Sequence, residues 1–136
     1  MTRKEAREQA FYLIFENQFK NESADEVLEN AALSRDLEED KYINFVFRGV
    51  NENIEEIDEY ISAALKGWSL SRISKTTLAA MRLCVFEMGW CNDIPISVSI
   101  NEAVEIIKKF ATKEDASFAN GILGTISKEL KSGEVK

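Results

Sequence analysis

Apolar residues recur every three or four positions along most of the chain, and this spacing limits the folds available to it. Residues spaced in this way lie on one side of an α-helix, where other helices can bury them. Windows of alternating β-branched residues, which indicate strands, are missing. The 136 residues also contain only one proline and six glycines, so few positions interrupt a helix. The sequence therefore predicts an all-α protein, a compact bundle of six to seven helices.

Capping residues and helix breakers place the expected helix ends. A serine or threonine followed three residues later by glutamate can close a capping box at a helix start. Such pairs are Thr2 with Glu5, Ser23 with Glu26, and Ser99 with Glu102, with Ser97 as an alternative cap. Gly67 and the proline of the Asn-Asp-Ile-Pro run are the expected stops. The expected helices cover about 2–20, 23–33, 38–66, 72–88, 99–110 and 118–130.

The length of the chain predicts a single domain, residues 1–136, with one shared core. The segment after Gly67 divides it into two helical subdomains, residues 1–66 and 72–132. We expect Trp68 to be wedged where the two halves meet. Residues 131–136 are expected to fray.

The composition excludes several classes of function. The chain has no histidine, so it has no histidine base, no thiol–imidazole pair and none of the usual zinc sites. Adjacent glutamates on a helix diverge and do not form a catalytic pair. We therefore expect no enzyme activity, no metal and no cofactor. No stretch is apolar enough to span a membrane or to serve as a secretion signal, which predicts a cytoplasmic protein.

Three cations at the start of the first expected helix contrast with the overall charge. The chain carries 24 acidic and 17 basic residues, a net charge of −7. Arg3, Lys4 and Arg7 nevertheless stand where positive charge opposes the helix dipole. Either these side chains only improve solubility, or they are kept for an anionic ligand.

Six short motifs follow one another in the second half of the chain. They are Trp68-x-Leu70-x-Arg72-Ile73-x-Lys75, Met81-Arg82-Leu83, Phe86-Glu87-Met88, Asp93-Ile94-Pro95, Ile100-Asn101-Glu102-Ala103-Val104-Glu105 and Phe118-x-Asn120-Gly121-Ile122-Leu123. A basic first helix leading into Ala-Phe-Tyr-Leu-Ile-Phe-Glu precedes them. In this order the motifs resemble the NusB family of bacterial transcription antitermination factors.

The resemblance implies an all-α fold with two helical subdomains and a function without catalysis. Members of the family bind the boxA element of nascent, single-stranded RNA, mostly together with NusE, a small-subunit ribosomal protein. The pair joins RNA polymerase and supports antitermination in ribosomal RNA operons. Some members form homodimers through the surface that otherwise serves RNA or NusE.

The resemblance also assigns roles to individual residues. The arginine-rich start of the first helix transfers to Arg3, Lys4 and Arg7, which we expect to contact RNA phosphates. Lys113 adds a cation to the loop before Phe118. Phe118 could stack on an unpaired base, or it could pack in the core at the head of the stripe that continues to Ile122 and Ile126.

Other motif residues are expected to be structural or to face a protein partner. Trp68 and Arg72 are expected to be structural or to face a partner. Asn101 and Glu102 are expected to provide a cap and hydrogen bonds that join the subdomains, rather than RNA contacts. Asn120 and Gly121 are expected to set the turn and packing of the last helix. The resemblance suggests that the helix over 72–88, with its neighbours, receives NusE. Because the basic segment is sparse and the net charge is negative, the protein alone should bind boxA RNA weakly, and the NusE complex should bind it tightly.

Two other functions remain open on the sequence. An acidic helical scaffold protein would share the composition and the sparse basic segment. An RNA-binding accessory domain of an rRNA methyltransferase would share the fold, but nothing in the chain resembles a methyl-donor site.

Overall fold

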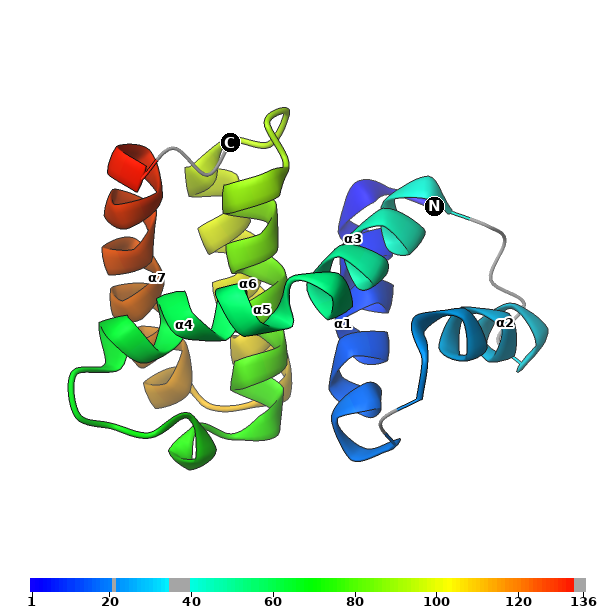
Figure 1. The fold of residues 1–136 in the computed structure, drawn as a ribbon, viewed down its shortest axis with the longest axis horizontal. Helices are drawn as coiled ribbons and strands as arrows, with labels where there is room; N and C mark the ends of the chain where they lie inside the picture. The colour runs from blue at the N-terminus through cyan, green and yellow to red at the C-terminus, as the bar shows by residue number, and fades with distance from the viewer. Residues whose placement is uncertain (21, 35–39, 134–136) are drawn as a thin grey trace.

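The computed structural model describes residues 1–20, 22–34 and 40–133. Within these ranges the chain forms seven α-helices, one short 3₁₀ helix and no strand, so the predicted all-α fold is confirmed (Figure 1). The elements are α1 (Arg3–Lys20), α2 (Ala24–Ser34), α3 (Lys41–Glu52), α4 (Ile54–Leu65), η1 (Leu70–Arg72), α5 (Lys75–Trp90), α6 (Ile96–Phe110) and α7 (Lys113–Gly133). No helix in the described ranges is long and apolar enough to cross a membrane.

The first two helices start as their capping boxes predict. The backbone N–H of Glu5 donates to Thr2 Oγ1 at 3.1 Å, and that of Thr2 donates to Glu5 Oε1 at 3.0 Å. The backbone N–H of Glu26 likewise donates to Ser23 Oγ at 3.2 Å. These bonds satisfy N–H groups that have no partner within the helix. Most of the predicted link from Ser34 to Asp40 lies outside the described residues.

The single helix predicted over 38–66 is wrong, because the chain breaks it at Asn53 into α3 and α4. The side-chain amide of Asn53 donates to the Gly49 carbonyl at 2.8 Å, alongside the Asn53 backbone N–H at 3.0 Å. An asparagine side chain that hydrogen-bonds to a nearby backbone carbonyl competes with the backbone hydrogen bonds that would continue the helix. Apolar periodicity does not show the break, because the buried stripe continues on both sides of it.

Gly49 allows α3 to pack closely against α5. A Cβ added at Gly49 would overlap the ring of Phe86, which is buried between Phe45 and Trp90. Glycine at this position therefore permits the close approach of α3 and α5.

Helix α5 is the centre of the fold rather than one wall of it. Of the 16 residues of α5, 12 are buried, so the helix is covered on most of its faces. The helix contacts α1, α3, α4, α6 and α7. Figure 1 shows α1, α2 and α3 on one side of it and α4 and α7 on the other. Most of this helix is therefore unavailable to a partner protein.

The last two helices differ from the sequence expectation in their caps and their faces. Helix α6 begins after Pro95, so Ser99 lies inside it as a buried residue, and the predicted Ser99–Glu102 capping box is wrong. Thr112 caps α7, with the Asp115 N–H donating to its Oγ1 at 3.0 Å. The buried stripe of α7 is Ala116, Ala119, Leu123, Ile126 and Leu130. Of the predicted frayed tail, residues 134–136 lie outside the described residues, and α7 extends to Gly133.

Candidate nucleic-acid interface

Arg7 lies inside the protein, although the sequence assigned it to RNA. The residue is 3% exposed, and its Nε donates to Glu87 Oε2 at 2.9 Å. The hydroxyl of Tyr42 donates to the same carboxylate oxygen, so α1, α3 and α5 meet at Glu87. Burial opposes the charge of Arg7, but Glu87 and its other neighbours outweigh burial and raise the pKa of Arg7. Arg7 therefore stays charged and paired with Glu87 in the core, and its predicted role as a phosphate ligand stays a prediction.

Arg3 remains on the surface next to this buried network. Its guanidinium carbon lies 4.5 Å from the centre of the Tyr42 ring, a cation–π distance. Burial, followed by the charge of Glu87, raises the pKa of Tyr42 well above its usual value, so this ring keeps its proton. The exposed guanidinium of Arg3 therefore packs on the ring of a neutral tyrosine, Tyr42.

A groove of about 340 Å³ runs between α1 and α6, and we call it the α1–α6 groove. It is lined by Lys4, Arg7, Glu8, Glu102, Glu105, Ile106, Lys108 and Lys109. Each of its three lysines faces a glutamate. Nζ–Oε distances are 2.9 Å from Lys109 to Glu8, 3.9 Å from Lys4 to Glu102, and 3.7 Å from Lys108 to Glu105. The positive charge of the groove lysines is therefore already partly neutralised.

The Glu8–Lys109 pair is the best formed of the three. Lys109 donates to both carboxylate oxygens of Glu8, at 2.9 and 3.1 Å, and the Tyr12 hydroxyl donates to one of them at 2.9 Å. The hydrogen bond from Lys109 is the main reason that the pKa of Glu8 is lowered. An RNA phosphate must therefore compete with Glu8 for Lys109.

An aromatic side chain at one end of the groove was missed in the sequence. Phe110, the last residue of α6, is 38% exposed. Its ring stacks on Phe11 with centroids 5.6 Å apart, and Lys109 Nζ lies 5.2 Å from its centre. The Lys-Lys-Phe sequence at the end of α6 was the only signal for this site. An exposed ring beside a lysine is suited to stacking a base and binding its phosphate.

Phe118 and Trp68 form a second aromatic pair. Phe118 is 38% exposed, which decides against core packing, and its ring centre lies 6.5 Å from that of Trp68. Trp68 is 56% exposed, so it is not wedged between the two halves as predicted. Arg72 is also exposed, and its guanidinium lies 5.4 Å from the Trp68 ring centre. Lys113, exposed at the start of α7, is three residues beyond Phe110.

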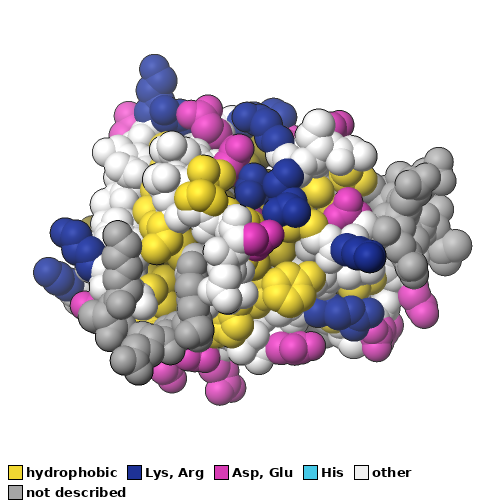
Figure 2. All heavy atoms as spheres, turned by 90° about the horizontal axis from the view of Figure 1, so that it is seen from above, with side chains coloured by type: hydrophobic (Ala, Val, Ile, Leu, Met, Phe, Trp, Pro, Cys, Tyr) yellow, Lys and Arg dark blue, Asp and Glu magenta, His cyan; other side chains and the backbone are white. Residues whose placement is uncertain are grey.

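The five residues predicted to bind RNA do not form one patch. Arg3 and Lys4 start α1, whereas Lys113 and Phe118 lie in the first turns of α7, and Figure 1 shows these helix starts at opposite ends of the molecule. Figure 2 views the end where α1 starts and shows lysine and arginine side chains dispersed among acidic and apolar ones. The α1–α6 groove and Phe110 lie between the two ends. We call this series, from Arg3 through the groove to Phe118, the candidate strip.

Three of the predicted structural residues have different surroundings from those expected. Asn120 and Gly121 are exposed in the middle of α7, and a Cβ at Gly121 would meet nothing within 4 Å, so neither sets a turn or internal packing. Asn101 is exposed on α6, and it does not cap that helix. Glu102 does join helices, because it pairs with Lys4 and lies 3.7 Å from Arg7 Nη1.

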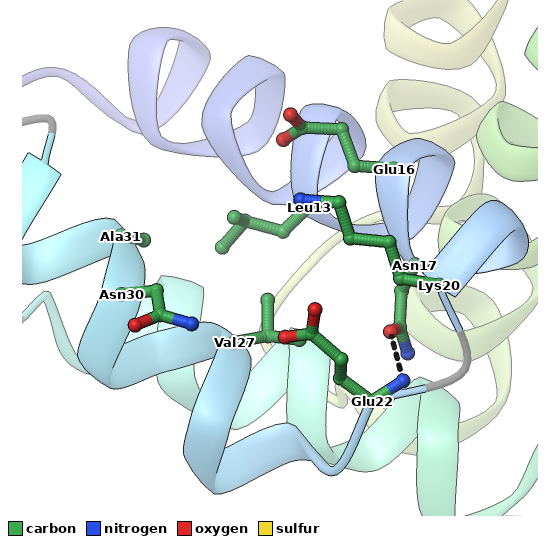
Figure 3. A pocket seen from close by; sticks show the side chains of 8 residues that line it. All are labelled: Leu13, Glu16, Asn17, Lys20, Glu22, Val27, Asn30 and Ala31. Atoms are coloured by element: carbon green, nitrogen blue, oxygen red, sulfur yellow. Dashed lines mark hydrogen bonds between the residues drawn. The ribbon is translucent and has the colours of Figure 1, made fainter.

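A smaller pocket between α1 and α2 does not suit a nucleotide (Figure 3). Its volume is about 90 Å³, room for only a few water molecules. Leu13 from α1 and Val27 from α2 project into it, while Asn17 accepts a hydrogen bond from the Glu22 backbone N–H at 3.1 Å. This pocket is therefore a packing gap beside α2 rather than a ligand site.

Comparison with known proteins places this geometry in context. The family model described as the NusB family matches residues 4–128. The transcription antitermination protein NusB of Acetivibrio thermocellus is 45% identical over 130 residues, covering 94% of this chain and 90% of that protein. The NusB protein of Clostridium acetobutylicum is 38% identical over 138 residues, covering 100% of both chains.

Solved structures agree with these sequence matches. NusB of T. maritima superimposes with a TM-score of 0.83 at 36% identity, covering 95% of this chain and 92% of that one. A crystal structure of the antitermination factors NusB and NusE in complex with double-stranded RNA gives a TM-score of 0.83 at 25% identity, covering 93% of this chain and 96% of that one.

Proposed function

The chain belongs to the NusB family of transcription antitermination proteins, which are not enzymes, and from this premise we propose that it binds boxA-type RNA together with NusE. In the proposed complex the protein supports antitermination by RNA polymerase in ribosomal RNA operons. The function is assembly: RNA, NusE and polymerase are held together by shared contacts, so each weak contact strengthens the others. The NusB–NusE–RNA complex among the similar structures supports this combination of partners.

The observation that carries the RNA proposal is the α1–α6 groove, whose Lys109 lies beside the partly exposed ring of Phe110. Lysine side chains match phosphate groups, and each neutralised phosphate releases counterions. Aromatic rings stack on unpaired bases of single-stranded RNA. We assign Lys4 and Lys109 to phosphates, and Phe110 and Phe118 to bases. Arg3 and Lys113 extend the positive charge at the two ends of the candidate strip.

The internal ion pairs explain why a partner is needed. Lys4, Lys108 and Lys109 each face a glutamate, and the whole chain carries a charge of −7. RNA must either displace these carboxylates from the lysines or bind to a surface whose positive charge is partly neutralised. Both reduce the affinity for RNA at physiological salt. NusE adds contacts to the same RNA and compensates for this loss.

The test is the affinity for a short boxA RNA, measured by fluorescence anisotropy with and without NusE. We expect NusE to tighten binding on the order of 100-fold, the lower end of what linked sites provide. A scrambled RNA serves as the control for sequence. Equal affinities for the boxA RNA with and without NusE would contradict the proposal that NusE tightens RNA binding.

A scaffold function is the second candidate, and the ion-paired lysines are the observation that favours it. An acidic helical protein whose groove lysines are engaged internally can serve protein partners alone. Absence of RNA binding even with NusE present would select this function. Self-association through the candidate strip, as in homodimers of the family, would compete with RNA, and sedimentation with and without RNA detects it.

A further inference from the structure

The C-terminal end of α1 carries an exposed aromatic ring that the candidate strip does not include. Phe19 is 63% exposed, more than any other large hydrophobic residue in the described part of the chain. Its ring meets that of Phe15, one turn earlier in α1, nearly edge-on, with ring centroids 5.3 Å apart. The ring is therefore held by its own helix, while most of its surface faces solvent.

A lysine from another helix lies beside this ring. Lys75 is the first residue of α5, and its Nζ lies 6.0 Å from the centre of the Phe19 ring. The side-chain amide of Gln18 donates to the Lys75 carbonyl at 2.9 Å, which ties the end of α1 to the start of α5. Figure 1 shows both helix ends at the bottom of the molecule. We call these two residues the Phe19–Lys75 pair.

Lys75 differs from the lysines of the α1–α6 groove in its charge environment. Each groove lysine faces a glutamate, whereas Lys75 makes no ion pair with any residue that the structure describes. The first turn of α5 contains no acidic residue, and positive charge at a helix start opposes the helix dipole. Lys75 is therefore an exposed, uncompensated cation, and a phosphate that binds it displaces no carboxylate.

A series of aromatic rings connects this pair to the candidate strip. Ring centroids 5.6, 6.2 and 5.3 Å apart link, in order, Phe110, Phe11, Phe15 and Phe19. Only the two end rings are exposed, and each has a lysine beside it. The combination of an exposed ring and a lysine, which Phe110 forms with Lys109, therefore occurs a second time at the other end of one aromatic series.

We propose that the Phe19–Lys75 pair binds one further nucleotide of single-stranded RNA, outside the boxA element, an inference that rests on the proposed function. The Phe19 ring stacks on the base, and the Lys75 ammonium binds an adjoining phosphate. Every base has a face that can stack on an aromatic ring, so this site accepts any sequence. The pair thus adds affinity for RNA that flanks boxA without adding to the sequence preference.

The first test compares RNAs of different length on the protein–NusE complex. One RNA contains boxA alone, and two others carry about four additional uridines at the 5′ or the 3′ end, a length within the range of single-strand sites. We expect one of the two extensions to tighten binding about fivefold or more, the lower end of what one stacked base provides.

The double variant Phe19→Ala/Lys75→Gln should lose this gain and bind the short RNA like the parent. Phe45→Ala/Lys128→Gln is the matched control, because it removes an exposed ring and an exposed lysine from other helices. The control should keep the gain from the extension. Thermal unfolding of both variants shows whether they are folded.

Single variants separate stacking from charge. Phe19→Ala should lower the affinity for the extended RNA without changing its salt dependence, and Phe19→Trp, which keeps an aromatic face, should retain the affinity. Lys75→Gln should flatten the slope of log affinity against log salt by about 0.7 for the extended RNA, and leave the slope for the short RNA unchanged. A residue with only a structural role would affect both RNAs equally.

The outcomes distinguish this inference from the proposed function. A parent complex that does not bind the short boxA RNA overturns the proposed function, and this inference falls with it. A parent complex that binds the short RNA but gains nothing from either extension overturns the Phe19–Lys75 site alone. The site is also overturned if the gain survives in the double variant, or if that variant loses affinity for NusE instead, since the pair would then face a protein.

Discussion

Arg7 and Glu87 are 80 residues apart in the sequence and form an ion pair inside the protein. Arg7 Nε lies 2.9 Å from Glu87 Oε2, and the two side chains are only 4% and 0% exposed. Tyr42 donates to the same oxygen from α3. A charge from the basic start of α1 therefore helps to hold three helices together.

Removing one member of this pair should destabilise the protein strongly. Arg7→Met leaves the carboxylate of Glu87 buried without its cation, and we expect a loss of about 3–5 kcal/mol in the free energy of unfolding. Arg7→Met/Glu87→Met removes both charges and should recover most of that loss. Urea unfolding followed by circular dichroism measures both. A double variant as unstable as the sum of the single variants would contradict the pairing.

Tyr42 should make stability sensitive to alkaline pH. Its pKa in the folded protein is raised by burial and by Glu87, whereas in the unfolded chain it is about 10. The stabilisation is therefore fully present below pH of about 10 and is lost as pH rises above it. Unfolding free energy measured from neutral pH to beyond that point should fall more steeply for the parent than for Tyr42→Phe. Parallel curves would show that Tyr42 does not contribute.

Gly49 should not tolerate a methyl group. Gly49→Ala places a Cβ into the Phe86 ring, which Phe45 and Trp90 confine, and we expect a cost of about 1–3 kcal/mol despite the better helix propensity of alanine. Phe86→Leu should be less harmful in the Gly49→Ala background than in the parent. Thermal unfolding of the four proteins measures this coupling, and additive effects would argue against contact between the two sites.

Glu8→Gln should strengthen RNA binding. The substitution removes the carboxylate that binds Lys109 at 2.9 Å, so the lysine becomes available to a phosphate. The slope of log affinity against log salt should become steeper by about 0.7, the value for one additional phosphate on single-stranded RNA. Glu29→Gln changes the net charge equally on α2 and serves as the control. If both variants gained the same RNA affinity, the effect would come from the overall charge and not from the release of Lys109.

Local sequence patterns predicted the parts of the fold that depend on neighbours in sequence. The capping boxes of α1 and α2 and the stop at the single proline were correct, because each involves groups within four residues. The break at Asn53 was missed, since a side-chain bond to the Gly49 carbonyl leaves the apolar periodicity intact. Ser99 has the spacing of a cap but lies within α6, because the helix already begins after Pro95.

The candidate site was harder to predict because it depends on distant partners. Nothing near Arg7 in the sequence indicates that Glu87 will bury its charge. Phe110 and Phe118 have the spacing of core residues, and only the packing of α6 and α7 shows that both rings are partly exposed. The pairing of Lys4 with Glu102 and of Lys109 with Glu8 is visible only after the helices are assembled.

The most direct test of RNA binding along the candidate strip is the salt dependence of boxA affinity for the protein–NusE complex. The parent is compared with Lys4→Gln/Lys109→Gln, and Lys128→Gln serves as a control for lost positive charge on α7. If Lys4 and Lys109 contact phosphates, the slope of log affinity against log salt should flatten by about 1.4 in the double variant and change little in the control. A double variant with the parent slope and affinity would place the RNA elsewhere on the protein.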